Sequence, residues 1–120
     1  MSSRNEKLAQ RTRRNLQEFR TAFTDIRFDT ALHALPKKDQ ERAALARFGA
    51  ALAVQRIDND GFASIAGQLA AQAPDIRAGI AELDDALDDL TQARAIVDAA
   101  GAAVSLVGQV LKLVGVKLPV

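Results

Sequence analysis

An unbroken alternation of three- and four-residue spacings between apolar residues runs through the last third of this chain. It begins at Ile76 and ends at Leu118, and none of its positions is polar. The positions are Ile76, Gly79, Leu83, Ala86, Leu90, Ala93, Val97, Ala100, Val104, Val107, Leu111, Val114 and Leu118. Because the average spacing is 3.5 residues, these side chains form one seam of a helix that packs against another helix. We therefore predict one long heptad-patterned helix over residues 74–118.

The remaining sequence also favours helices. The chain of 120 residues has many alanines, few glycines and prolines, no cysteine, and only phenylalanine among its aromatic residues. Breaks are expected at Pro36, at the turn-forming residues 58–61 and before Pro74. We predict a single all-α domain over residues 1–120, an elongated helical bundle of three to four helices. Its predicted helices are 4–35, 37–57, 61–72 and 74–118, and the second should bury Leu45, Phe48 and Leu52 beside several alanines.

The net charge of +1 conceals two oppositely charged halves. Residues 1–56 carry twelve basic and six acidic side chains, whereas residues 57–120 carry four and nine. This division favours attraction between the halves before it favours nucleic acid. The expected electrostatic contact joins the basic start of the first helix to the acidic start of the last, through Arg4, Lys7, Arg11, Arg14, Glu82, Asp85 and Asp89. A parallel three-rod arrangement brings these groups together, and a four-helix arrangement with a reversal at residues 58–61 does not, so both topologies stay open.

The end of the predicted long helix is apolar nearly all round, and glycine recurs there every seven residues, at Gly101, Gly108 and Gly115. Glycine costs about 0.8–1 kcal/mol relative to alanine inside a helix, so a close neighbour is expected along this stripe. The neighbour is a helix of the same fold, another copy or a membrane partner. The predicted interface comprises Val97, Ala100, Gly101, Val104, Val107, Gly108, Leu111, Val114, Gly115 and Leu118.

No residue pattern indicates catalysis or a cofactor, so we expect no enzyme, no metal and no small-molecule substrate. The acidic run at residues 82–89 lacks histidine partners for a di-metal site, and residues 58–61 fail the calcium-loop pattern at both ends. His33 stands alone near a predicted helix end. The basic residues of the first helix are interspersed with acids and have no aromatic neighbours to stack on bases, which makes nucleic acid an unlikely partner.

The leading functional hypothesis is a non-enzymatic interaction or assembly protein that self-associates or binds a partner helix through its apolar C-terminal helix. The alternative is a membrane-active protein, a helical pore subunit or peripheral adaptor, that inserts residues 99–118. A nucleic-acid or toxin-neutralising adaptor is the third hypothesis. The N-terminal sequence has no apolar segment of the kind found in secretory signals, so the expected location is cytoplasmic, with possible association at a membrane surface.

Overall fold

The computed structural model describes residues 4–113, and every regular element in that range is helical, which confirms the all-α prediction. Six α-helices replace the three or four that were predicted, because the first and last predicted helices each contain a turn. The elements are α1 (Arg4–Ala22), α2 (Ile26–His33), α3 (Lys37–Asp60), α4 (Phe62–Leu69), a 3-10 turn (Ala70–Gln72), α5 (Ala73–Leu87) and α6 (Ala93–Val110).

The first predicted helix, residues 4–35, is interrupted at residues 23–25. Asp25 caps α2, since its carboxylate accepts a hydrogen bond from the Arg27 amide at 2.9 Å. The Arg27 side chain binds the same carboxylate at 2.9–3.0 Å and lowers the pKa of Asp25 to about 2. Asp and Thr side chains compete with helical backbone bonds in this way, and Thr24 does so through its hydroxyl, which donates to the Thr21 carbonyl.

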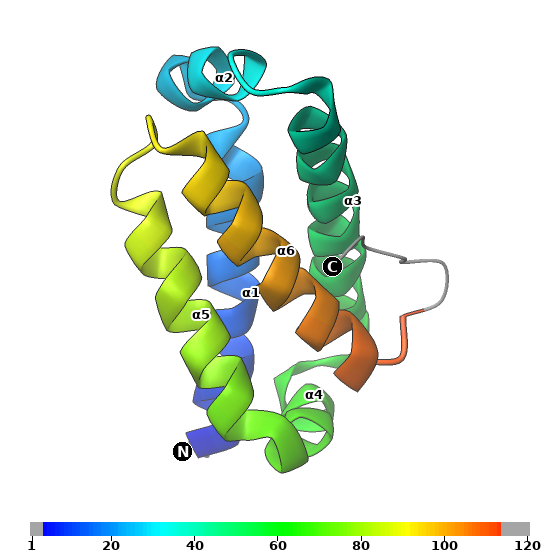
Figure 1. The fold of residues 1–120 in the computed structure, drawn as a ribbon. Coiled ribbons are helices and arrows are strands. Elements are labelled where there is room, and N and C mark those ends of the chain that lie inside the picture. The colour runs from blue at the N-terminus through cyan, green and yellow to red at the C-terminus, as the bar shows by residue number, and fades with distance from the viewer. Residues whose placement is uncertain (1–3, 114–120) are drawn as a thin grey trace.

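The largest correction concerns the predicted helix over residues 74–118. α5 ends at Leu87, and α6 begins at Ala93 and runs back in the opposite direction (Figure 1). In the turn, Asp89 accepts hydrogen bonds from the amide of Thr91 at 3.0 Å and from its hydroxyl at 2.6 Å. The residues of the seam therefore lie on two antiparallel helices, α5 and α6, which form a helical hairpin. The 3-4 spacing continues across the turn because each helix buries one face in the same core.

Helix α6 ends at Val110 with a Schellman motif. The Leu113 amide donates to the Gly108 carbonyl at 2.9 Å, and the Lys112 amide donates to the Gln109 carbonyl at 3.2 Å. Lys112 has a φ of 54°, the left-handed conformation that this motif requires. The chain thus turns sharply at Lys112, and residues 114–118 of the predicted helix lie outside the described residues.

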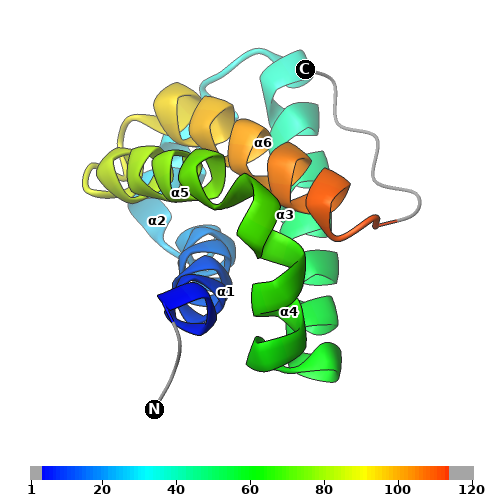
Figure 2. The same ribbon diagram turned by 90° about the horizontal axis from the view of Figure 1, so that it is seen from below.

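The four longer helices α1, α3, α5 and α6 pack around one apolar core. α1 and α5 run in one direction, and α3 and α6 run in the other, with α2 at one end of the molecule and α4 at the other (Figure 1). Figure 2 shows α4 beside α1 and α3, and α5 beside α6. The largest fully buried side chains include Phe19, Phe28, Leu8, Leu16, Ile57, Ile65, Leu69, Ile76, Ile80, Leu83, Ile96 and Leu111. Within the described residues, the chain folds into six α-helices, and none of them is the long heptad-patterned helix that was predicted.

Candidate functional site

Helix α3 faces the core with small residues and the solvent with large apolar ones. Its buried side consists mainly of Ala43, Ala46, Gly49, Ala50, Ala53, Val54 and Ile57. Leu45 is 41% exposed, Phe48 is 56% exposed, and Leu52 is half-buried. The prediction that these three side chains face inward was wrong. Small residues on the inner side allow α1 and α6 to pack closely, so the larger residues of α3 lie outside.

We call the solvent-facing apolar side of this helix the α3 outer face. It comprises Ala44, Leu45, Phe48, Ala51 and Leu52. Three of them, Leu45, Phe48 and Leu52, repeat at three- and four-residue spacing, so their side chains form one row along the helix. An exposed row of this kind, rather than a single exposed apolar residue, is typical of a contact surface.

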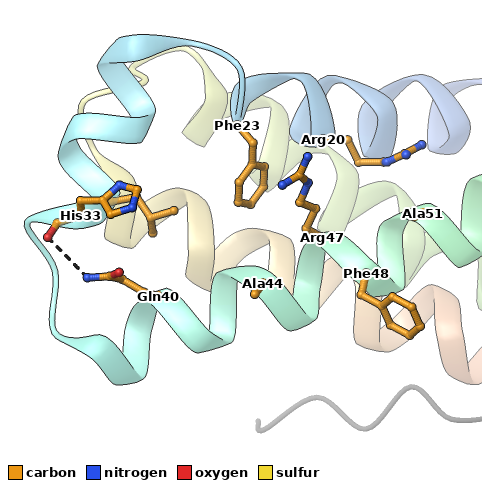
Figure 3. Close-up of a pocket in the computed structure, with 9 residues that line it drawn as sticks. Arg20, Phe23, His33, Gln40, Ala44, Arg47, Phe48 and Ala51 are labelled. Atoms are coloured by element: carbon orange, nitrogen blue, oxygen red, sulfur yellow. Dashed lines mark hydrogen bonds between the residues drawn. The ribbon is translucent and has the colours of Figure 1, made fainter.

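An open groove of about 480 Å³ lies beside the α3 outer face, between α1, α2 and α3 (Figure 3). The Arg47 guanidinium carbon is 4.8 Å from the centre of the Phe23 ring, within the range of a cation–π contact. Phe23 in turn makes edge-to-face contacts with Phe19 and Phe28 at 5.2 and 5.1 Å. One wall of the groove is therefore a cluster of three phenylalanine rings. The guanidinium of Arg47, from α3, lies over one of these rings.

Two arginines in this groove are not neutralised by acids within residues 4–113. Arg20 donates to the Gln17 side chain at 2.9 Å, and Arg47 contacts the Phe23 ring. On the opposite wall, Gln40 donates to the Leu35 carbonyl at 2.9 Å and to the His33 carbonyl at 3.4 Å (Figure 3). The groove thus offers apolar walls and positive charge. It holds no paired nucleophile and base that would carry out a reaction.

A second, smaller hollow lies at the other end of the α3 outer face. It has a volume of about 190 Å³, and its lining residues are Leu52, Gln55, Arg56, Asn59 and Leu113. Leu113 is the last described residue and belongs to the cap of α6. The chain therefore leaves α6 directly beside Leu52.

The structure places most of the predicted interface inside the chain's own core. Six of those residues are buried against neighbouring helices: Val97, Ala100, Val104, Val107, Gly108 and Leu111. Gly101 is half-buried, and Val114, Gly115 and Leu118 lie outside the described residues. The C-terminal helix is therefore covered largely by α3 and α5 of the same molecule.

The glycine stripe does not mark a close approach between helices at the positions that the structure describes. A Cβ atom added at Gly101 or Gly108 would meet no atom within 4 Å. The close approach is at Gly79 of α5, where a Cβ atom would lie 3.9 Å from the Cα atom of Ala103. No described helix of the same chain therefore comes close at Gly101 or Gly108.

The predicted electrostatic contact does not form as ion pairs in the described residues. α1 and α5 do run parallel and pack together, but none of Arg4, Lys7, Arg11 and Arg14 pairs with Glu82, Asp85 or Asp89. The polar contact between these helices is instead made by Asn15, whose side-chain amide donates to the Asp84 carboxylate at 2.7 Å and to the Ile80 carbonyl at 3.3 Å.

Other ion pairs link the helices. Arg13 of α1 binds Asp58 of α3 at 2.5 Å, and the hydrogen bond from Arg13 lowers the pKa of Asp58. Arg42 of α3 binds Asp98 of α6 at 2.8 Å. The attraction expected between the basic and acidic halves is therefore present at these two contacts, through other residues than those predicted.

The described residues contain no group of three His, Cys, Asp or Glu side chains that could hold a metal ion. The His33 imidazole contacts Asp29, with Nδ1 at 2.8 Å from its carbonyl and 3.3 Å from its carboxylate. One described helix, Ala93–Val110, is long and apolar enough to cross a membrane, with a mean hydropathy of 1.3 over 18 residues. Half of that segment is buried in the fold.

The chain matches no protein-family model, no curated protein and no solved structure. The functional argument therefore depends on the chain's own residues. The α3 outer face and its groove were missed in the sequence because hydrophobicity alone does not separate the two sides of α3.

Proposed function

We propose that this protein is a non-enzymatic assembly module that self-associates through the α3 outer face. The observation that carries this proposal is the exposure of Leu45 and Phe48 on a helix whose buried side is formed mainly of alanine and glycine. We therefore propose the contact on α3, whereas the sequence alone suggested the C-terminal helix.

Physical magnitudes favour a weak but specific contact. Burying a Leu or Phe side chain fully contributes about 1.5–3 kcal/mol, and each copy would bury the exposed parts of Leu45 and Phe48. A patch on one helix can pair with the same patch on a second copy around a two-fold axis, so each apolar residue contributes twice. Phe48 lies at the middle of the row and would lie closest to that axis.

A membrane-active protein is the second candidate, supported by the apolar segment Ala93–Val110. Its insertion would require α6 to leave its contacts with α3 and α5, which makes the core the main barrier. Flotation with liposomes of neutral and anionic lipid tests this candidate. The nucleic-acid or toxin-neutralising hypothesis is supported only by the exposed basic residues of α1, and steep salt dependence of binding would be its signature.

The test of the proposed function places a photoreactive p-benzoylphenylalanine at Phe48 of the full chain. Irradiation should give a discrete adduct at the mass of two copies, because the reactive ring would lie inside the contact. The matched control carries the same group at Ile26, which is 73% exposed on α2 and lies outside the proposed contact. Equal adduct formation at both positions, or an adduct at neither, would contradict the proposal.

A further inference from the structure

The seven residues that follow Leu113 have an apolar residue at every second position. Val114, Val116, Leu118 and Val120 alternate with Gly115, Lys117 and Pro119. In an extended segment, alternate side chains point to opposite faces, so all four apolar side chains would share one face. That face requires an apolar surface to cover it.

The α3 outer face adjoins the residue from which this segment begins. Leu113 and Leu52 line the same hollow, and the turn at Lys112 directs the chain away from the axis of α6. Leu113, the last described residue, therefore lies beside one end of the row formed by Leu52, Phe48 and Leu45.

The spacings of the segment and the row agree. Two residues of an extended chain advance about 6.6 Å, whereas three or four residues of a helix advance about 4.5–6 Å. Successive inward side chains of the segment can therefore contact successive members of the row, with Val114 near Leu52, Val116 near Phe48 and Leu118 near Leu45. The paired stretch from Val114 to Leu118 would span about 13 Å when extended, close to the distance of about 10 Å from Leu52 to Leu45.

We propose that residues 114–120 bind the α3 outer face of their own chain in extended form and compete with the second copy for it. The competition rests on the proposed function, whereas the binding of the segment does not. Lys117 would point away from the apolar row, which agrees with the alternation. Self-association would then require displacement of the segment from both copies, and the apparent association constant would fall with the square of the fraction of chains whose face is free.

The binding of the segment is tested by disulfide formation, for which the chain is suited because it contains no cysteine. The variant Leu45→Cys/Leu118→Cys should form an intrachain disulfide on mild oxidation, at a rate independent of protein concentration. The control Ile26→Cys/Leu118→Cys should remain reduced under the same conditions, because Ile26 lies on α2 and outside the row. Failure of the first pair to close, or equal closure of both pairs, would overturn the proposal.

The competition is tested by sedimentation of the chain truncated after Leu113. If the segment covers the face in about nine chains of ten, truncation should strengthen self-association by about a hundredfold, because the face must be free on both copies. The variant Leu118→Asp in the full chain should show the same direction of change, because the segment would bind less well. Unchanged or weaker self-association in both variants would overturn the competition. A closed disulfide together with a truncated chain that stays monomeric would contradict the proposed function while the binding of the segment stands.

Discussion

Gly61 joins α3 to α4 in a conformation that other residues rarely adopt. Its φ of 84° and ψ of 156° lie in a region that is essentially restricted to glycine. Its amide donates to the Ile57 carbonyl at 2.9 Å and its carbonyl accepts from the Ile65 amide at 3.1 Å, so both helices are held by this residue. The sequence predicted a break over residues 58–61, but α3 continues to Asp60 and only Gly61 is non-helical.

Replacement of Gly61 by alanine should lower the free energy of unfolding by about 1–3 kcal/mol, because the backbone conformation is strained for any residue with a Cβ atom. No neighbouring atom lies within 4 Å of such a Cβ, so the cost would come from the backbone alone. Urea denaturation measures the change. The control Gly67→Ala, inside α4 and equally unobstructed, should instead raise the free energy of unfolding by about 0.5–1 kcal/mol. A Gly61→Ala variant as stable as the wild type would contradict this account.

At the scale of helices, the sequence predicted helical content well and helix boundaries poorly. The breaks at Pro36 and Gly61 were predicted because proline and glycine act locally, although residues 58–60, which were expected to lie in the turn, belong to α3. The turn at Asp89 was missed because the 3-4 pattern continues through it, and the pattern reports only which face is buried. The orientation of α3 was missed for a different reason: close helix packing selected alanine for its inner side, and no local signal records the distance between helices.

The cap of α6 gives a prediction at this scale. Lys112 occupies the left-handed position of the Schellman motif, where glycine is favoured. Replacing Lys112 by glycine should therefore raise the free energy of unfolding by about 1 kcal/mol. Thermal unfolding followed by circular dichroism measures the change. Replacing Lys38 by glycine in the first turn of α3 should have the opposite sign, because that residue is helical. A Lys112→Gly variant less stable than the wild type would exclude the capping role.

At the scale of the molecule, most of the apolar residues that were predicted to contact a partner are buried in the core of the chain itself. Val104 and Leu111 are fully buried within one chain, so the seam at the end of the sequence serves folding. Apart from Ile26 on α2, the large apolar side chains left exposed among the described residues are on α3, where Phe48 is the most exposed member of the row. The candidate site could not be predicted from the seam, because its exposure depends on which helices cover α3, and that is a property of the tertiary fold.

The most direct test of self-association through the α3 outer face is sedimentation velocity of the full chain from low to high micromolar concentration. The wild type should sediment faster as its concentration rises, and Phe48→Asp should remain a monomer with unchanged helix content, because a carboxylate would be buried without a partner in the contact. The control Ile26→Asp should behave as the wild type. A wild type that stays monomeric at every concentration, or a Phe48→Asp variant that associates as the wild type does, would contradict the account.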